Sequence, residues 1–505
     1  MRNHQKMTLL KQKEKSKIQN TASLRGLYKR RAASLLFTFY FLLFTLSFSA
    51  SASPEDRRAV PVQHNGRVKP FDSFARQTLK LVSGKEIWRG LSANDLFGGL
   101  LPDRSRIADL KWIRVDYLEL KQKLGLNGSE HFFSLNEISP SVSEVGSLVQ
   151  SAKEKRAKDL RPSKLEQKAE QLYVKTQTVQ GLVFGEIPVY VSLGTGFKIH
   201  LEILYNSVKP FELAAVFYFL AFLFLLFAGK NRVFGGAGFW LAVLALSFHT
   251  FGLAARVTIL SRPPVSNMYE SMIFMNWALL VFALIFSALR RSLTAIQAGC
   301  AMSGFVMLYA NLLPIDSSLD VVVAVLRSNY WLTIHVLTIV SSYGAFGLAL
   351  GLGHRHLFLD ATRGFSKKAE EGSAELIFRV IQLGTLLVGT GTFLGGVWAN
   401  ESWGRFWGWD PKETWALITF LGYLLVVHLK YAKKISSFIL ALSSVFGFLL
   451  VLMTWYGVNF VLGRGLHSYG AGAGGTEWIV YFLIFEATFL AWVLWRKVAM
   501  TISSG

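Results

Sequence analysis

The sequence is poor in cysteine and in charged residues. Cys300 is the only cysteine among 505 residues, which excludes an internal disulfide, a CxxC redox pair, a thiolate zinc cluster and a CxxCH haem-attachment motif. Charged residues make up 17% of the chain and hydrophobic residues 52%. The hydrophobic residues gather in runs close to the ~20 residues that span a bilayer. The chain is therefore not a c-type cytochrome, and its composition predicts a polytopic membrane protein.

The charge is one-sided. There are 54 Lys and Arg residues against 32 Asp and Glu residues, which gives a formal net charge of +22. On a soluble protein such an excess would indicate a nucleic-acid partner. Here the basic residues lie mostly beside hydrophobic runs, where they orient membrane helices. We therefore expect the membrane, and no nucleic acid, as the counterpart of this charge.

The N-terminal segment, residues 1–52, has the pattern of a targeting sequence. Its first 32 residues hold ten Lys or Arg and one acidic residue, Glu14, and an apolar stretch (35–48) then leads to Ala50-Ser51-Ala52. A basic region, a short hydrophobic core and an A-x-A site are typical of a cleaved signal peptide, with a retained signal anchor as the alternative. Both predict that the following segment is exported.

That segment, residues 53–208, is polar and of ordinary soluble character. It contains a charged, helix-prone stretch from Ser151 to Gln180 and a strand-like run from Leu182 to Val191. It is long enough to bury a modest core of its own, and it contains no catalytic constellation. We expect an extracytoplasmic soluble domain that serves as a spacer or a docking domain.

The remaining part, residues 209–505, holds apolar runs of membrane-spanning length. They lie at 210–228, 237–259, 271–289, 294–313, 330–352, 377–397, 413–430, 436–457 and 477–495. Lys and Arg are concentrated after every second run, which places those loops in the cytoplasm. We expect an all-α polytopic protein of the plasma (inner) membrane with about nine transmembrane helices. The outward loops are then 260–270, 314–329, 398–412 and 458–476.

One outward loop, residues 395–415, is rich in tryptophan. It holds Trp398, Trp403, Trp407, Trp409 and Trp415, five of the 14 in the chain. An aromatic belt would spread its rings over many helix ends, so this density favours a platform for a large flat apolar ligand. Interleaved glycines allow close approach, and Arg405 and Lys412 are placed to meet anionic groups. Asp410 and Glu413 either orient the loop or cap the next helix.

Three histidines lie along one path through the membrane. His335, near the outer surface, and His467, in the last outward loop, flank the Trp-rich loop from different helices, as axial ligation of one haem iron requires. His428 lies fifteen residues after Glu413, which is ~22 Å deeper in a helix. It suits a second, inner haem position. For each histidine a hydrogen-bonded structural role is the alternative.

Three further histidines are expected to have other roles. His249 is intramembrane, and a structural role is the favoured interpretation. His354 and His356 are expected to be solvated loop residues on the cytoplasmic side, with a haem-collecting role as the alternative.

At this point the sequence resembles a known family: the tryptophan-rich "WWD" haem-handling membrane proteins, and within it the CcsA (ResC-like) subunits of system II cytochrome c synthases. The resemblance covers roughly residues 210–475. It rests on Gly396–Asn400 with Trp407–Trp415, on Trp331–Val336, on Gly457–Phe460 with Leu466–Gly470, and on Arg256 with Pro264 and Tyr269–Ser271.

The resemblance implies a set of ligands and partners. His335 and His467 match the family's extracytoplasmic haem ligands, and His428 matches its membrane-embedded ligand; His249 matches none. In the family the inner haem takes its second ligand from a CcsB (ResB-like) part. Only one apolar stretch precedes residue 208, so a separate CcsB/ResB-like partner is expected. Residues 61–70 also resemble a stretch found upstream of the CcsA part in fused synthases.

The implied function is cytochrome c biogenesis. Haem b, bound as substrate, crosses the membrane and is presented for thioether attachment to the reduced CxxCH motif of an apocytochrome c, with a thiol-reducing system as a further partner. No catalytic acid, base or nucleophile is expected, so any enzyme activity belongs to the synthase formed with CcsB. The alternatives are a WWD-type haem exporter or delivery subunit without ligase activity, and a proton-coupled small-molecule transporter.

Overall fold

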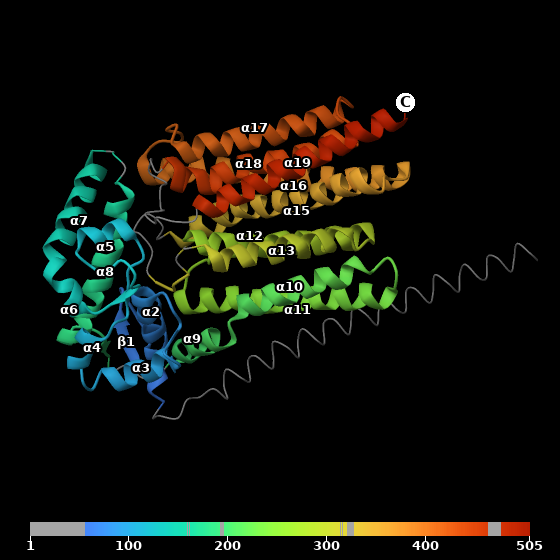
Figure 1. The fold of residues 1–505 in the computed structure, drawn as a ribbon. Coiled ribbons are helices and arrows are strands. Elements are labelled where there is room, and N and C mark those ends of the chain that lie inside the picture. Colours follow the sequence, from blue (N-terminus) through green and yellow to red (C-terminus); the bar gives the residue numbers. More distant parts are fainter. Residues whose placement is uncertain are drawn as a thin grey trace, which may run out of the picture. The chain divides into compact units, whose positions relative to one another are not determined.

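The computed structural model describes residues 56–504, apart from 159, 161, 192–195, 314, 316, 321–327 and 463–475. The expected targeting segment and His467 lie outside the described residues. Arg57–Gly505 form one compact unit with two separate hydrophobic cores, one built from residues between 62 and 182 and one from residues between 211 and 493. We call residues 57–191 the amino-terminal domain and residues 197–504 the helical bundle (Figure 1).

The amino-terminal domain is mainly helical, with small antiparallel sheets. Its elements are η1 (Arg57–Ala59), β1 (Pro61–His64), β2 (Arg67–Pro70), α2 (Phe71–Ser83), β3 (Ile87–Trp88), β4 (Leu91–Ser92), α3 (Ala93–Leu100), α4 (Ser105–Asp109), β5 (Ile113–Arg114), α5 (Leu118–Lys123), β6 (Phe132–Phe133), α6 (Leu135–Ile138), η2 (Ser139–Ser141), α7 (Val142–Ala157), α8 (Lys164–Phe184) and β7 (Val189–Tyr190). The main sheet has the order β2-β1-β7, with Val62 opposite Lys69 and Tyr190. The turn of the β1–β2 hairpin has positive φ at both Asn65 and Gly66, as a type I′ turn requires.

Two local expectations for this domain need correction. The helix-prone stretch 151–180 is divided between α7 and α8, and α8 begins after Pro162 with a capping box of Ser163 and Glu166. The strand-like run is wrong at its start, because α8 continues through Phe184 and ends at Gly185, which has a φ of 81°. Only Val189–Tyr190 is a strand.

The helical bundle confirms the all-α polytopic fold. Its elements are α9 (Phe197–Val208), α10 (Pro210–Leu226), α11 (Arg232–Leu260), α12 (Met268–Arg290), α13 (Thr294–Leu312), α14 (Asn329–Trp331), the π-helix η4 (Leu332–Val336), α15 (Leu337–Thr362), α16 (Lys367–Trp403), α17 (Pro411–Tyr431), α18 (Ser437–Leu452), the π-helix η5 (Met453–Leu462) and α19 (Thr476–Ser504). Among the described residues, 9 helical stretches are long and apolar enough to cross a membrane. The first of them includes α9 as well as α10.

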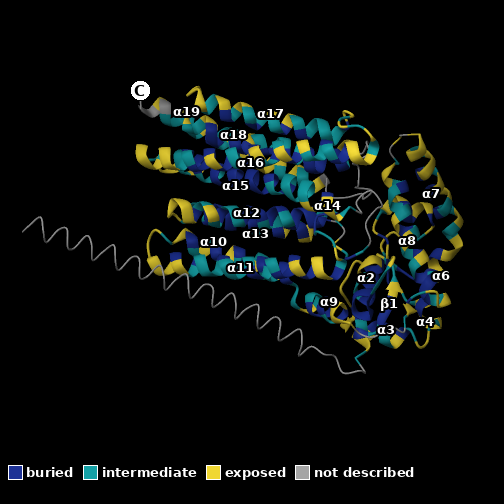
Figure 2. Cartoon of the chain, turned by 180° about the vertical axis from the view of Figure 1, so that it is seen from behind, coloured by how far each residue is buried: buried dark blue, intermediate teal, exposed yellow. Residues whose placement is uncertain are grey.

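Helix α15 is the central helix of the bundle and is the most deeply buried of these stretches (Figure 2). Glycines on it allow its neighbours to approach closely. A Cβ at Gly344 would lie 2.6 Å from the Met275 carbonyl oxygen on α12, and a Cβ at Gly353 would lie 2.1 Å from Ser444 Oγ on α18. Small residues at such contacts are the usual means of packing membrane helices.

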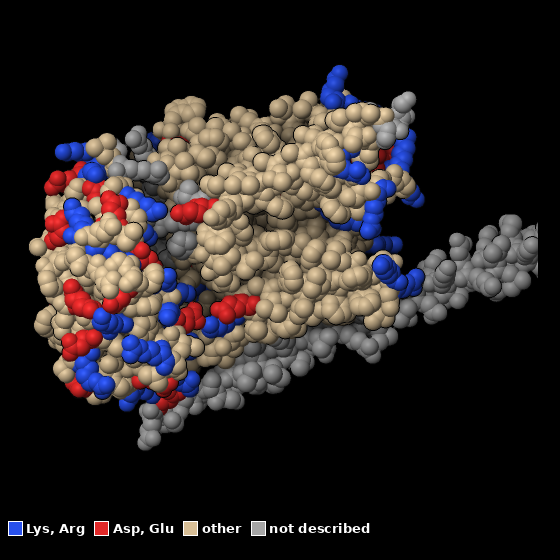
Figure 3. Space-filling view, in the orientation of Figure 1, with Lys and Arg blue, Asp and Glu red and all other residues tan. Residues whose placement is uncertain are grey.

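Charge is distributed unevenly over the bundle. The side chains along the middle of the helices form a broad uncharged band in Figure 3, and Lys and Arg gather at the end away from the amino-terminal domain. These basic residues lie where α10, α12, α15 and α17 end and the following helices begin, for example Arg290 and Lys430. The chain is a multi-pass membrane protein, and its charge pattern is that of one orientation in the bilayer.

Candidate functional site

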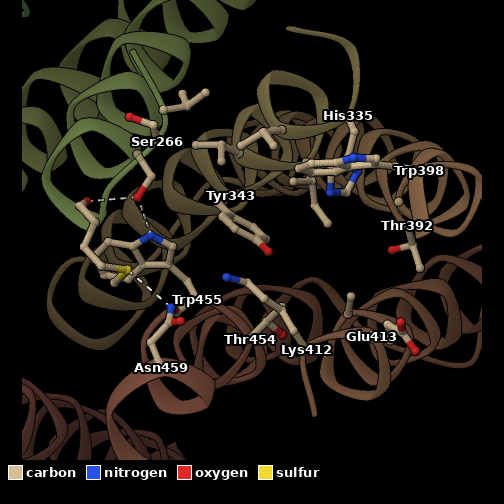
Figure 4. A pocket seen from close by; sticks show the side chains of 18 of the residues that line it. Ser266, His335, Tyr343, Thr392, Trp398, Lys412, Glu413, Thr454, Trp455 and Asn459 are labelled. Atoms are coloured by element: carbon tan, nitrogen blue, oxygen red, sulfur yellow. Dashed lines mark hydrogen bonds between the residues drawn. The ribbon is translucent and has the colours of Figure 1, made fainter. Parts of the chain in front are cut away.

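A cavity lies between α12, η4, α15, α16, α17 and η5 (Figure 4). The empty space within it is about 1010 Å³, which includes the part open to the outside. Its lining is mainly aliphatic and aromatic with a few polar groups. The polar and aromatic lining residues are Ser266, Asn267, Ser271, His335, Tyr343, Thr392, Trp398, Trp407, Lys412, Glu413, Thr454, Trp455 and Asn459.

His335 enters this cavity from the first π-helix. Its Nδ1–H donates to the Gly391 carbonyl oxygen on α16 over 2.8 Å, so the lone pair of the neutral ring is on Nε2. A Cβ at Gly395 would lie 2.7 Å from His335 Cε1. Glycine at this position therefore allows α16 to pack against the imidazole. π-Helical turns occur frequently at functional sites, and this one fixes both the position and the tautomer of the histidine.

Two tryptophans support the histidine. Trp398 is buried and lies edge-on to the His335 ring, with centroids 5.6 Å apart. Trp331 stacks on Trp398, with ring centroids 6.3 Å apart and an interplanar angle of 10°. The Trp331 Nε1–H donates to the Glu401 carboxylate at 2.9 Å. The pair forms a small hydrophobic cluster of its own with Leu332. Part of the aromatic density thus holds the imidazole in place.

We had expected the whole Trp-rich segment 395–415 to be a loop, but only part of it is. Helix α16 continues to Trp403 and ends at Gly404, which has a φ of 70°, so the turn is only residues 404–410. Helix α17 begins directly afterwards, with Pro411 in its first turn and a capping box of Asp410 and Glu413. The expectation that these two acids cap the next helix is confirmed.

The structure brings some of the expected site residues together and leaves others outside. His335, Trp398, Trp407 and Lys412 line the cavity, and Figure 4 shows the Lys412 amino group directed into it near Tyr343. Four expected residues of the Trp-rich segment are not among its lining: Trp403, Arg405, Trp409 and Asp410. Trp403 packs on the Arg405 guanidinium at 6.0 Å, and Trp409 packs edge-on to Trp407 at 5.8 Å.

One wall of the cavity was missed by the sequence analysis. Trp455 on η5 donates from Nε1 to Ser271 Oγ on α12 at 2.9 Å, and Asn459 donates to the Trp455 carbonyl oxygen at 2.8 Å. Polar residues within an apolar run are the signal that would have indicated them. The block Gly457–Phe460 lies in this π-helix.

His428 lies away from the cavity. It is sixteen residues after Lys412 on the same helix, ~24 Å along the axis, and its ring is exposed, with Nδ1 donating to the Leu424 carbonyl oxygen at 2.8 Å. The exposed residues Ile418, Leu421 and Leu425 share its face by their helical spacing. His428 is therefore part of an exposed apolar stripe, defined by these four residues.

The other three histidines considered in the sequence have protein partners. His249 is fully buried, and its ring nitrogens contact Tyr218 Oη at 3.0 Å and the Ile273 carbonyl oxygen at 3.1 Å, so both nitrogens are occupied. The expectation of solvated loop positions for His354 and His356 is wrong, because α15 continues past both. His354 Nε2 contacts Glu486 at 3.1 Å, and His356 Nδ1 contacts Ser373 Oγ at 3.0 Å.

Comparison with known proteins agrees with the resemblance seen in the sequence. The family model described as "Cytochrome C assembly protein" matches residues 265–467, which include every described wall of the cavity. "Cytochrome c biogenesis protein CcsA" of Pyropia yezoensis is 31% identical over 323 residues, covering 54% of this chain and 99% of the relative. The CcsA of Prochlorococcus marinus (strain MIT 9215) is 32% identical over 259 residues, covering 46% of this chain and 83% of the relative.

A longer relative extends the similarity upstream of the bundle. "Protein NrfI" of Wolinella succinogenes is 30% identical over 494 residues, covering 81% of this chain, so the match reaches into the amino-terminal domain. The chain spans about half the length of that relative, 53%. Taken with the near-complete coverage of the Pyropia protein, these matches show that the chain belongs to the CcsA family of cytochrome c biogenesis proteins.

Proposed function

We propose that the chain binds haem in the cavity through His335 and presents it for covalent attachment to an apocytochrome c. The observation that carries the proposal is the imidazole itself, held by Gly391 through Nδ1 and by Trp398 on its edge at the lining of a cavity. Metal-ligating histidines usually donate their other N–H to a carbonyl or carboxylate in this way. The family model and the CcsA relatives support a role in cytochrome c biogenesis.

The chemistry of the lining fits haem. The rings of Trp398, Trp407 and Trp455 and the aliphatic side chains between them suit a flat apolar macrocycle. Lys412 supplies a cation for the propionate carboxylates. Haem is the substrate of this site, so what the chain contributes is binding and orientation.

We assign the second axial ligand to His467. Asn459 is the last cavity-lining residue of η5, and His467 follows it by eight residues, a separation that an extended chain bridges over at most ~27 Å. Two imidazoles saturate the iron, and axial ligation is one means by which a protein sets its redox state.

We further propose that His428 holds haem at an earlier, inner position together with a partner subunit. The observation in favour is exposure: an imidazole on an apolar membrane-facing stripe with Ile418, Leu421 and Leu425 is costly in lipid. A CcsB/ResB-like membrane protein that packs on this stripe would shield the His428 imidazole from lipid and would supply the second axial ligand to the inner haem. In this assignment the cavity and the amino-terminal domain face the outside of the plasma membrane.

The attachment step is an addition reaction. The S–H of each CxxCH cysteine adds across a haem vinyl group; the sulfur–carbon bond forms, the thiol hydrogen ends on the neighbouring vinyl carbon, and no net electrons are transferred. The attacking thiols belong to the apocytochrome, where a thiol-reducing system keeps them reduced. Among the described residues the only thiol is that of Cys300, which is buried. The contribution of this chain is a rigidly held ring with an accessible vinyl edge.

The test is covalent haem transfer by the full chain purified with its co-expressed partner. A peptide with a CxxCH motif, haem and a thiol reductant are supplied, and haem that remains on the peptide after denaturation is measured. We expect wild type and the control His131→Ala, altered in the amino-terminal domain, to form product, and His335→Ala to lose at least ~10-fold. Bound haem without product in wild type and control would support a haem-delivery subunit without ligase activity. Failure of wild type to bind haem would contradict both the synthase role and the delivery role.

A further inference from the structure

An ion pair between a buried lysine and a partly exposed aspartate, 23% exposed, joins the amino-terminal domain to the bundle. Lys69 on β2 is fully buried, and its ammonium donates to Asp320 Oδ1 at 2.6 Å. Asp320 also accepts from Asn65, in the turn of the same hairpin, at 3.1 Å. Beside them Arg67 forms two hydrogen bonds, at 2.8 and 2.6 Å, to Glu202 on α9. A buried lysine is tolerated only with such a partner, so Asp320 fixes where the hairpin sits.

From Asp320 the network continues to two arginines. Arg262 donates to the Asp320 carbonyl oxygen at 3.3 Å and to Glu270 Oε2 at 2.7 Å. Arg256, which is fully buried, donates to the carbonyl oxygens of Ser317 and Ser318 at 3.1 and 2.9 Å and to Glu270 Oε1 at 2.8 Å. The two guanidinium groups therefore hold the 317–320 segment and Glu270 together. Such planar, multi-donor bridging is specific to arginine.

Glu270 connects this network to the cavity wall. It is the third residue of α12, and its Oε2 accepts from the backbone N–H and Oγ of Ser266 at 3.0 and 2.6 Å. Ser266, Met268 and Ser271 all line the cavity, and Ser271 Oγ accepts from Trp455 Nε1 on the same side of it. Figure 4 shows Ser266 and Trp455 on this side of the cavity. The Glu270 carboxylate therefore holds the cavity wall opposite His335, and Arg262 connects Glu270 to Asp320, which binds the β1–β2 hairpin.

The polar contacts add direction to a packed junction. Helix α9 packs against β2, α2 and η1 of the amino-terminal domain as well as against α11, and its Ile199, Leu201, Ile203 and Leu204 are buried. Apolar packing is non-directional, whereas the ion pairs and hydrogen bonds of Lys69, Arg67 and Asp320 specify which groups meet.

We propose that Asp320 is a positioning residue of the cavity: by holding the β1–β2 hairpin through Lys69, it makes the amino-terminal domain set the geometry of the wall formed by residues 262–271. The proposal extends the function proposed above, but the coupling is a property of the chain alone. It is therefore tested first without haem.

The test is amide hydrogen exchange of the full chain in detergent, followed by mass spectrometry. The reporters are three backbone amides of the cavity wall. The Ser266 N–H donates to the Glu270 carboxylate, the Glu270 N–H to Asn267 Oδ1, and the Ser271 N–H to the Asn267 carbonyl oxygen. Asp320→Asn, Lys69→Met and the double variant are compared in the His335→Ala background, so that haem plays no part. Asp116→Asn is the matched control, because Asp116 pairs with Arg114 and His131 within the amino-terminal domain.

We expect each single variant to speed exchange at the reporters by ~2- to 150-fold, the range of a coupled pair, and the double variant to add little more. Asp116→Asn should leave them unchanged. Asp320→Glu, which keeps the carboxylate, should recover most of the protection. Asn65→Gly removes the hydrogen bond to Asp320 while glycine accepts the positive φ of this turn position. It is the milder variant should the others fold poorly, and a smaller change in the same direction is expected.

A second readout separates positioning from stability. This readout uses haem-loaded protein that retains His335. There, Asp320→Asn should alter the absorption spectrum of the reduced haem, while the melting midpoint of this variant stays close to that of Asp116→Asn. Faster exchange confined to residues 61–70, additive effects of the two substitutions, or an unchanged reporter in Asp320→Asn would overturn the coupling. Loss of haem binding by wild type, with the exchange pattern intact, would contradict only the proposed function.

Discussion

The Nδ1–H of His335 donates to the Gly391 carbonyl oxygen over 2.8 Å, a contact made between a π-helix and the middle of a long helix that follows it in the chain. The contact requires the two backbones to lie close together. Gly391 and Gly395 provide this, because a Cβ at either position would lie under 3 Å from a side chain of η4 or α15. Gly391 and Gly395 on α16 therefore allow the helix to approach His335 and the start of α15.

Gly395→Ala should disturb the site without removing a ligand. The added Cβ would lie 2.7 Å from His335 Cε1, so the imidazole must move, and we expect haem affinity to fall by roughly 10-fold or more. Absorption titration of the purified protein measures it. Gly372→Ala on the same helix is the matched control, since a Cβ there meets nothing within 4 Å. Equal affinities in the two variants would argue against the packing role of Gly395.

Lys412→Gln should weaken binding of haem but not of its dimethyl ester. The ammonium is directed into the cavity (Figure 4), and a charge-assisted contact to a propionate contributes ~1.5–3 kcal/mol. We expect haem to bind roughly 10- to 100-fold more weakly and the ester to bind equally to both proteins. Lys434→Gln, in the loop after α17, serves as the control. An equal loss for both ligands would mean that Lys412 supports the fold instead.

Leu425→Asn should separate the chain from its membrane partner. Leu425 is 59% exposed and lies on the stripe that carries His428, so a polar side chain there disfavours an apolar helix–helix contact. We expect co-purification of the partner to fall while haem binding at the outer cavity persists. Leu386→Asn, at another exposed membrane position (67%) on α16, controls for general effects on insertion. Loss of the partner in both variants would remove the case for the stripe.

Acid should release the amino-terminal domain from the bundle. Burial raises the pKa of Asp320, but the charge of Lys69 and the hydrogen bonds from Lys69 and Asn65 outweigh it, and the pKa lies below its usual value. A carboxyl group with a depressed folded pKa stabilises above its unfolded pKa of ~3.9, and this is lost as the pH falls through the folded value. The protection factors of the amides at residues 61–70, in which the intrinsic pH dependence of exchange is divided out, should therefore be constant from pH 7 to ~5 and fall below ~4. In Asp320→Asn this acid step should be absent; its persistence would place the titration elsewhere.

Much of the fold followed from the sequence. The nine spans were predicted because hydrophobic runs and basic loops report directly on the bilayer. The position of His335 beside the Trp-rich segment was predicted because an ionisable side chain inside a span and five tryptophans in one short segment are both unusual; its contact with Trp398 is what the structure adds. The extent of helix in the Trp-rich segment was not predicted, because the helical residues 395–403 and the turn 404–410 are alike in being rich in glycine and tryptophan.

Other features depend on contacts that no local pattern encodes. Lys69 and Asp320 are 251 residues apart in sequence, and neither stands out among the charged residues around it. A π-helical turn holds about one residue more than an α-helical turn. The π-helical turns at His335 and Trp455 therefore change which side chains face the cavity, and the α-helical period does not predict them. Trp455 was therefore assigned to an ordinary span and Asn459 to the outward loop 458–476, although both line one wall of the site.

The most direct test of the central claim is the absorption spectrum of haem bound to His335→Gly, purified with its partner, before and after addition of imidazole. If His335 ligates the iron in this cavity, the variant should lose the reduced bis-imidazole spectrum, and free imidazole should restore it together with haem transfer to the CxxCH peptide. A variant that keeps the wild-type spectrum without imidazole would contradict the claim.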